Sequence, residues 1–328
     1  MTWRAYRLVY QAKSPIHIGW HTLGYINLTR YYIPGRTMWG AFTANLVRAQ
    51  ENKDQGQYEK IGKLLRTNII MSYFFPALDE DHPLLPEYTD EGIKFGCNDN
   101  GGHIYSSEEF ERLFISSYGQ TAVVPDSNTA EDTSLHESEF IAHVINENKH
   151  EKPVYFVGYI FINDQANIDG NSVGWEEKEI NLKDAISEIF VGGDRTYGWG
   201  RLVLDEMKTQ TLEKTDNNFF NCRIKLDVSE GWPTVTIPKN GPIPAHLNIN
   251  SNMKIKGDIE PLVGRAWGTV EYNDDKGNVV GRHGAGQLIE RLSAHNNLFW
   301  LPGSVITEEA DPPDPHIGSY GLLMKVRG

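Results

Sequence analysis

The part of the sequence that most constrains the fold is the block from Pro153 to Asp205. It opens with PVYFVGYIFIN (Pro153–Asn163), a run of β-branched and aromatic residues that predicts a strand. A short helix is expected over Asn181–Phe190, a glycine loop over Val191–Arg201 and another strand over Arg201–Asp205. The block therefore predicts strand, helix, glycine loop and strand in that order.

The N-terminal part predicts a similar alternation of strands and helices. Residues 3–19 alternate polar and apolar side chains and predict a half-buried strand that ends near Ser14-Pro15, and a short β-like piece follows at Arg30–Ile33. Apolar residues then recur at helical spacing from Thr37, which is a suitable N-cap. A second helix over Tyr58–Thr67 leads into a strand over residues 68–75.

The remaining sequence suggests an insertion, a linker and a second, β-rich half. Residues 76–150 are acidic and polar with one short helix near Ser107–Phe114, which indicates an insertion or lid. We expect an N-terminal domain over 1–205, an exposed linker over 206–218 and a C-terminal domain over 219–328. Within the last domain the sequence predicts strands at 219–228 and 321–326, turns at 231–244 and a short helix at 287–292.

Charge is distributed unevenly along the chain. The net charge of −13 argues against a nucleic-acid partner, since phosphates are held mainly by Lys and Arg. Residues 1–50, however, contain six basic residues and no Asp or Glu, whereas residues 51–200 contain 28 acidic and 11 basic residues. The acidity is therefore local and does not exclude an RNA-binding surface.

The cysteine count and the hydropathy indicate an intracellular protein. Cys97 and Cys222 are the only cysteines, and they suggest neither a disulfide framework nor a zinc cluster. No apolar run approaches the length of a membrane span, and the N-terminus does not have the pattern of a signal peptide. We therefore expect a cytoplasmic protein without a membrane partner, a metal or another cofactor.

The glycine loop combines residues that suit a phosphate backbone. Its glycines permit positive φ and close backbone approach, its arginines can make bidentate phosphate contacts, and its aromatic rings can stack on unpaired bases. The loop is neither a Walker motif nor a dinucleotide-binding fingerprint, because it follows a helix and opens a strand. The alternative is a tight glycine turn with surface arginines.

The acid-free N-terminus is a second candidate surface. Its basic residues are interleaved with nine aromatic residues, as a surface for single-stranded RNA requires, although an aromatic core face would give the same pattern. Gly35-Arg36-Thr37 at a helix start could also hold a phosphate. His17 and His21 lie four residues apart without nearby metal ligands, which leaves structural, RNA-contacting or acid–base roles open.

Three motifs together resemble the RAMP superfamily of CRISPR-associated proteins. They are SPIHIG (Ser14–Gly19), YIPGRTMWGAF (Tyr32–Phe42) and FVGGDRTYGWGRLVL (Phe190–Leu204), in that order. Residues 121–141 look like a middle element of these subunits, and GDIEPLVGRAW with FWLPGSV looks like the C-terminal part of type III cap-type subunits. The resemblance implies an α+β fold: a ferredoxin-like domain of the RNA-recognition-motif type with a long insertion, plus a second β-rich ferredoxin-like half.

The resemblance also implies a function without catalysis. It suggests a subunit of a type III effector that grips the 5′ handle of CRISPR RNA and caps the filament, with backbone and large subunits as partners and target RNA contacted indirectly. Backbone subunits cleave target RNA with a loop carboxylate, but Asn27 stands near that place here and an amide cannot replace it. The residues expected to contact RNA are His17, Trp20, His21, Arg30, Arg36, Thr37, Trp39, Gly192, Gly193, Arg195, Thr196, Tyr197, Gly198, Trp199 and Arg201.

Other interpretations remain open at the level of sequence. The chain could be a metal-independent endoribonuclease that processes precursor CRISPR RNA with His17 or His21 as the base, or an inactive backbone-type subunit. Outside RNA biology, its aromatic residues would also suit a β-rich module that binds carbohydrate or protein.

Overall fold

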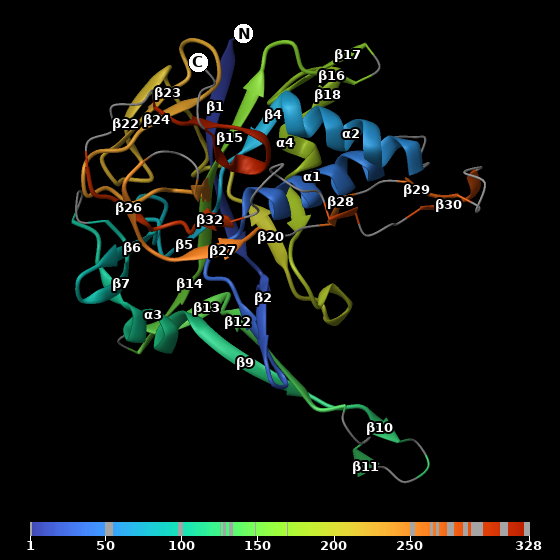
Figure 1. Ribbon diagram of the computed structural model, residues 1–328, viewed down its shortest axis with the longest axis vertical. Coiled ribbons are helices and arrows are strands. Elements are labelled where there is room, and N and C mark those ends of the chain that lie inside the picture. The colour runs from blue at the N-terminus through green and yellow to red at the C-terminus, as the bar shows by residue number, and fades with distance from the viewer. Residues whose placement is uncertain are drawn as a thin grey trace.

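The computed structural model shows a mixed α+β protein with many strands and few helices (Figure 1). It describes the chain except for residues 1, 50–54, 98–100, 125, 127–128, 131–133, 148, 169, 250–252, 263–264, 267–268, 274–278, 285–287, 290–297, 309–313 and 325–328. The helices are α1 (Gly35–Ala49), α2 (Gln55–Thr67), α3 (Ser107–Phe114) and α4 (Leu182–Ala185), with 3-10 turns η1 (Arg195–Tyr197) and η3 (Ser319–Gly321).

The central sheet is built around the N-terminal strand. Its strands follow the order β19-β20-β1-β15-β4, with β21 beside β1 and β5 beside β15, and all of these neighbouring strands run antiparallel. The strands are β1 (Trp3–Ala12), β4 (Ile69–Met71), β5 (Phe75–Ala77), β15 (Tyr155–Asn163), β19 (Glu188–Phe190), β20 (Arg201–Leu204) and β21 (Gln210–Thr211).

This sheet is buried on both faces. Along β1, Tyr6, Leu8 and Tyr10 belong to one core cluster with residues of α1, whereas Trp3 and Ala5 belong to a second cluster with residues of the C-terminal half. The expectation of a half-buried first strand is therefore wrong. Figure 1 shows α1 and α2 on one side of the sheet and β22–β24 on the other. The face of the central sheet opposite α1 and α2 is thus covered by the C-terminal half.

The segment after β4 and β5, which the sequence predicts as an insertion with one short helix, folds into that helix and several short strands. Its strands are β6 (Pro86–Thr89), β7 (Gly92–Phe95), β8 (Tyr105–Ser106), β9 (Ile115–Gln120), β10 (Val123–Val124), β11 (Thr129–Ala130), β12 (His136–Ile141), β13 (Val144–Glu147) and β14 (His150–Pro153). In α3, Ser106 and Glu109 form a capping box, which is why this helix begins at Ser107 as the sequence predicts.

A second sheet joins the N-terminus to this insertion. It has the order β2-β3-β12-β9, where β2 (Gly19–Leu23) and β3 (Ile26–Thr29) come from the N-terminal part. Figure 1 shows this sheet extending away from the body, with β10 and β11 at its far end. All five residues of β2 are exposed, so this outer strand offers an accessible edge of the acid-free segment.

The C-terminal half is a further, mostly antiparallel sheet. Its order is β22-β23-β24-β34-β35-β25-β32-β27. The strands described in this half and before it are β16 (Asn167–Ile168), β17 (Asn171–Gly174), β18 (Ile180–Asn181), β22 (Thr215–Phe219), β23 (Ile224–Asp227), β24 (Thr234–Thr236), β25 (Leu247–Asn248), β26 (Ile255–Lys256), β27 (Ile259–Pro261), β28 (Arg265–Ala266), β29 (Thr269–Asn273), β30 (Val279–Gly284), β31 (Leu288–Ile289), β32 (Leu298–Trp300), β33 (Val305–Ile306), β34 (His316–Ile317) and β35 (Leu323–Met324).

Several boundaries differ from the sequence-based expectation. The segment 206–218, expected as a linker, contributes β21 to the central sheet and begins β22. The expected helix over 181–190 is helical only in α4, because residues 188–190 pair with β20 as β19. The single strand expected over 219–228 is two strands joined by a turn. The helix expected over 287–292 lies outside the described residues except for β31.

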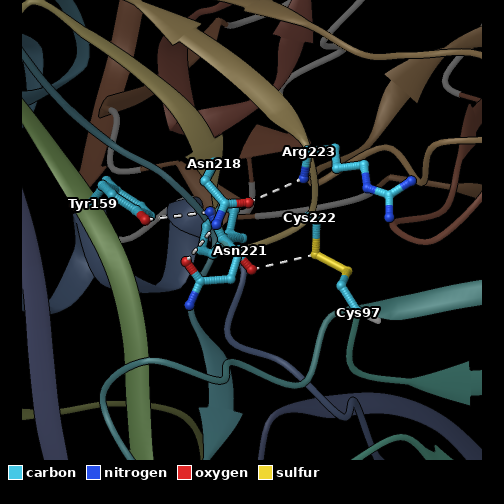
Figure 2. The surroundings of a disulfide bond; sticks show 7 residues. Cys97, Tyr159, Asn218, Asn221, Cys222 and Arg223 are labelled. Carbon is cyan, nitrogen blue, oxygen red and sulfur yellow. Dashed lines mark hydrogen bonds between the residues drawn. A yellow bond between two sulfur atoms is a disulfide. The ribbon is translucent and has the colours of Figure 1, made fainter. Parts of the chain in front are cut away.

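A disulfide joins the insertion to the C-terminal half. Cys97 and Cys222 are bonded, with their Cα atoms 5.3 Å apart and a sequence separation of 125. Figure 2 shows the bond beside the turn between β22 and β23, where the amide of Phe220 donates to the hydroxyl of Tyr159. The expectation that the two cysteines do not pair is therefore wrong, because the fold places them together at a distance that sequence spacing does not reveal.

Candidate functional site

The glycine loop is anchored on the SPIHIG segment. The amide of Gly193 donates to the carbonyl oxygen of His17 at 2.9 Å, and the amide of Gly200 donates to that of Pro15 at 2.8 Å. Gly192 has φ +73, and a Cβ on it would lie 2.0 Å from the carbonyl oxygen of His17. The close neighbour that requires glycine here is therefore the protein's own backbone, and two of the sequence motifs meet at this point.

The tip of the loop is exposed. Arg195, Thr196, Tyr197 and Gly198 are all exposed, and the Tyr197 side chain is 64% accessible. The backbone closes tightly around them, since the amide of Tyr197 donates to the carbonyl of Asp194 and that of Gly198 to the carbonyl of Arg195. A cation and an aromatic ring are thus presented to solvent on a loop whose base is fixed.

The end of the loop returns to the core. Trp199 is 8% exposed, and its ring meets the edge of Phe140 at 4.9 Å between centroids. The expected stacking of Trp199 on a base is not available in this position, because the ring is covered by protein. Arg201 is exposed and forms a two-point ion pair with Glu188 at 2.8 and 3.4 Å.

The two histidines of the N-terminal segment have different surroundings. His17 is buried, and its Nδ1 lies 2.6 Å from the carbonyl oxygen of Glu139, which can only accept. This contact places the proton on Nδ1 and leaves Nε2 as the acceptor. His21 is exposed on β2, and its ring lies against that of Trp20 at 4.5 Å between centroids.

Another group of predicted residues gathers around a pocket of about 180 Å³. Trp20, Arg30, Arg36 and Thr37 all line it, together with Tyr320 of the C-terminal half. The guanidinium of Arg36 lies 4.8 Å from the centre of the Tyr320 ring.

The sequence pattern predicts Thr37 as the N-cap of α1, and this prediction is wrong. The helix begins at Gly35, so Thr37 lies in the first turn and is not the N-cap. A Cβ on Gly35 would approach the carbonyl oxygens of Met71 and Tyr320, which shows that this end of the helix packs against protein. Trp39, further along α1, donates to the carbonyl oxygen of Gly62 in α2 and lines a different pocket.

A buried carboxylate, which the sequence analysis missed, holds two of the predicted residues. Glu260 is 5% exposed and accepts from the Arg30 guanidinium at 2.5 Å, His246 Nε2 at 2.6 Å and Trp20 Nε1 at 2.9 Å. Burial alone would raise the pKa of Glu260, but hydrogen bonds from His246 and Arg30 and the charge of Arg30 lower that pKa to about 2. Arg30 is therefore neutralised within the protein.

The histidine of this network is a neutral link. Burial lowers the pKa of His246, although its hydrogen bond to Glu260 opposes that shift. Its Nε2 therefore donates to Glu260, and its Nδ1 accepts from the hydroxyl of Tyr73 at 2.7 Å. Neither His246 nor Glu260 belongs to a motif with a recognisable spacing, so only the fold brings them beside Arg30.

Neither a metal-binding cluster nor a membrane-spanning helix is found among the described residues. Among these residues, no group of three His, Cys, Asp or Glu side chains is arranged to hold a metal ion. No helix in the described part of the chain is long and apolar enough to cross a membrane.

Comparison with known proteins finds similarity only among solved structures. No protein-family profile matches the chain, and no curated protein matches it. A structure described as type III-B Cmr-beta bound to cognate target RNA and AMPPnP is similar over 92% of this chain and 85% of that chain, with 10% identity and a TM-score of 0.45.

Two further structures cover less of the chain. Type III-B Cmr-beta in the apo state covers 61% of this chain and 96% of that chain, with 9% identity and a TM-score of 0.38. Oligomeric Cmr4 from Pyrococcus furiosus covers 65% and 100%, with 11% identity and a TM-score of 0.29.

Proposed function

We propose that this protein is a non-catalytic CRISPR RNA-binding subunit of a type III effector, of the kind that grips the 5′ handle and caps the subunit filament. The observation that carries the proposal is the loop tip at 195–198, which presents an arginine and a tyrosine on a base anchored to SPIHIG. A cation on a loop with a fixed base suits a phosphate, and an accessible ring suits an unpaired base. CRISPR RNA and the other effector subunits would be its partners, with target RNA contacted indirectly.

The strand order supports a ferredoxin-like reading of the first half. In chain order, β1, β4, β15 and β20 are its four main strands, α1 and α2 lie between the first two, and α4 lies between the last two. Their spatial order, β20-β1-β15-β4, is the order expected of that arrangement. Since the open face of the sheet is covered by the C-terminal half, the proposed RNA contacts are on the loop and not on the sheet.

Binding without cleavage is the proposed mode. Asn27 on β3 lies near the place where the resemblance to backbone subunits would put a carboxylate, and its side chain accepts from the hydroxyl of Thr22 at 3.1 Å. An amide cannot act as a general base. We therefore propose that the chain positions RNA and does not cut target RNA.

The test is RNA binding by a loop-tip variant. Arg195→Ala with Tyr197→Ala should weaken binding of a labelled CRISPR RNA handle by about tenfold or more, because stacking contributes about 1–3 kcal/mol per base. Fluorescence anisotropy over a salt titration should also show a slope reduced by about 0.7 for the lost phosphate contact.

A matched control uses an arginine at the other end of β1. Arg4 is half-exposed and pairs with Asp164. The end of the glycine loop lies near Lys13, whose amide donates to the carbonyl of Arg201. Arg4 is nine residues before Lys13, and nine residues of extended chain span roughly 30 Å. Arg4→Ala should leave RNA affinity unchanged. Equal affinity of the loop-tip variant and the wild type at every salt concentration would refute the proposed site.

One observation favours a second candidate function, metal-independent cleavage of precursor CRISPR RNA. The Glu139 carbonyl orients the His17 ring and leaves Nε2 as an acceptor, as a general base requires. Incubation of pure protein with precursor RNA in EDTA distinguishes the two. A specific cut that His17→Ala abolishes would establish the enzyme, whereas binding without a cut supports the proposed function.

A further inference from the structure

A larger pocket lies where three parts of the chain meet. It has a volume of about 540 Å³, which is within the usual range for ligand sites. The N-terminal segment contributes Trp20 and Tyr31, the insertion contributes Tyr88 and Phe95, and the C-terminal half contributes residues 257–260. The glycine loop, which carries the proposed RNA contact, does not contribute to its lining.

The lining of this pocket is strongly aromatic. Phe95 is buried, and the ring of Tyr31 packs against it at 5.9 Å between centroids. Trp20 is 43% exposed and lines the same pocket, with its indole nitrogen already bonded to Glu260. Aromatic rings attract planar cations as well as apolar groups.

Two carboxylates complete the lining. One oxygen of Glu111 accepts from the hydroxyl of Tyr31 at 3.0 Å, and one oxygen of Asp258 accepts from the hydroxyl of Tyr88 at 2.9 Å. Burial raises the pKa of Tyr31 and of Tyr88, and the adjoining carboxylates raise both further, so the phenols stay protonated and donate. Within the described residues, the second oxygen of each carboxylate has no hydrogen bond.

The charge of the pocket is negative. Glu260 is paired with Arg30 and contributes no net charge, whereas neither Glu111 nor Asp258 forms an ion pair with another described residue. Two like charges at one pocket repel a phosphate and attract a cation. This arrangement argues against a phosphate at this site, even though Trp20, His21 and Arg30 all line the pocket.

We propose that this pocket receives the side chain of an arginine carried by a partner protein. A guanidinium is planar, stacks on aromatic rings and carries several N–H donors that can reach carboxylate oxygens. It matches both the rings and the unused carboxylate oxygens, and its charge complements that of the pocket. This site is separate from the loop tip and does not depend on RNA binding there.

The test uses the whole protein and three short peptides. The probe is a capped pentapeptide, Gly-Gly-Arg-Gly-Gly, compared with the same peptide containing citrulline, which keeps the shape but lacks the charge. Isothermal titration calorimetry at low salt should show binding of the arginine peptide and about tenfold or greater loss with citrulline. A lysine peptide should bind less tightly than arginine, because an ammonium cannot make the planar contacts.

Variants assign the binding to the pocket. Glu111→Gln with Asp258→Asn should weaken the arginine peptide by about tenfold or more and leave the affinity for CRISPR RNA unchanged. The control is Glu151→Gln with Glu213→Gln, which removes two exposed carboxylates that do not line the pocket. This control should bind the arginine peptide as the wild type does.

Three outcomes would overturn the proposal. The first is equal binding of the arginine and citrulline peptides by the wild type. The second is unchanged binding of the arginine peptide by the pocket variant. The third is binding of guanosine monophosphate that the pocket variant abolishes, because the pocket would then receive a nucleotide and not an arginine. The first comparison needs no variant, so it holds even if a substitution impairs folding. The two proposals can fail separately. A result that refutes the RNA site at the loop tip leaves the arginine pocket untouched, and a result that refutes the arginine pocket leaves the RNA site untouched.

Discussion

Glu260 is the residue whose charge is most strongly held by its surroundings. It receives hydrogen bonds from Arg30, His246 and Trp20, which come from sequence positions 14 to 240 residues away. Replacing one partner of a buried ion pair leaves the other charge without compensation, and this usually costs about 3–5 kcal/mol. Arg30, which is 14% exposed in its side chain, would be left in that state by Glu260→Gln.

The pKa of Glu260 gives this residue a defined dependence on pH. Because its folded pKa is lowered from 4.5 to about 2, the ionised form stabilises the fold above pH 4.5, and this contribution is lost as pH falls toward 2. The loss should be about 2 to 3 kcal/mol. Urea unfolding followed by circular dichroism should therefore show the gap between wild type and Glu260→Gln shrinking from pH 7 to pH 2.5.

A control for this measurement is an exposed ion pair. Glu308 accepts from Lys254 at 2.6 Å, and both side chains are more than half exposed. Such pairs contribute about 0–1 kcal/mol, so Glu308→Gln should change the free energy of unfolding little at any pH. A gap for Glu260→Gln that stays constant between pH 7 and pH 2.5 would contradict the assigned charge state.

The hydrogen-bond network around Glu260 could not be predicted from the sequence, although two of its members were candidate site residues. Arg30 and Trp20 stood out because they lie in an acid-free, aromatic segment. Their acceptor lies in another sheet, on β27, and no spacing rule connects positions that meet only through tertiary packing. Arg30 was for that reason expected to be available to phosphate, whereas it is held by Glu260.

At the scale of elements, the glycine loop is a rigid base with an exposed tip. Gly192 and Gly198 both adopt positive φ, at +73 and +83. A Cβ on Gly192 would meet a backbone oxygen, whereas one on Gly198 would meet nothing within 4 Å. The two positions therefore separate the effect of a clash from the effect of the left-handed backbone.

We expect Gly192→Ala to destabilise the protein by about 2 kcal/mol or more, because the substituted residue is strained and must also displace the SPIHIG segment. Gly198→Ala should cost about 1 kcal/mol, since only the backbone conformation opposes it. Chemical denaturation of both variants checks the order. Equal destabilisation would show that the loop base is not packed as described.

Periodic elements were predicted better than irregular ones. The helices near 37–50, 58–67 and 107–114 are predicted from the sequence pattern, and the structure has them as α1, α2 and α3. The helix predicted over 181–190 is longer than the one in the structure. Its last residues, Glu188–Phe190, pair with β20 instead, because tertiary pairing overrides local preference. Residues 76–150 are predicted as an insertion with one short helix, but their strands are not, because these short strands carry too few apolar residues to show alternation.

At the scale of the whole molecule, the disulfide ties the insertion to the C-terminal half. It also stands next to a turn in which Phe220, Asn221 and Arg223 all adopt left-handed backbone, a conformation that costs free energy for residues other than glycine. Disulfides are uncommon in a reducing cytosol, so the redox state of the pair is a direct test of the structure.

Purified protein should contain no thiol that reacts under denaturing conditions until it is reduced, and two afterwards. Reduction should lower stability by about 4 kcal/mol, because the bond closes a long loop. Differential scanning calorimetry should show a corresponding fall in Tm of about 5–10 °C. The variant Cys97→Ser with Cys222→Ser should be insensitive to reductant, and two reactive thiols in unreduced wild type would contradict the bond.

The position of β1 at the centre of the sheet has a consequence for synthesis of the protein. Its partners β15, β20 and β21 begin 152 to 207 residues after it starts. At about 5–20 residues per second, a ribosome needs roughly 10–40 s after making β1 before β20 is available. During that interval Leu8, Val9 and Tyr10, which are fully buried in the finished fold, have no sheet to enter. The nascent chain should therefore depend on chaperones that bind apolar segments until its first strand can pair.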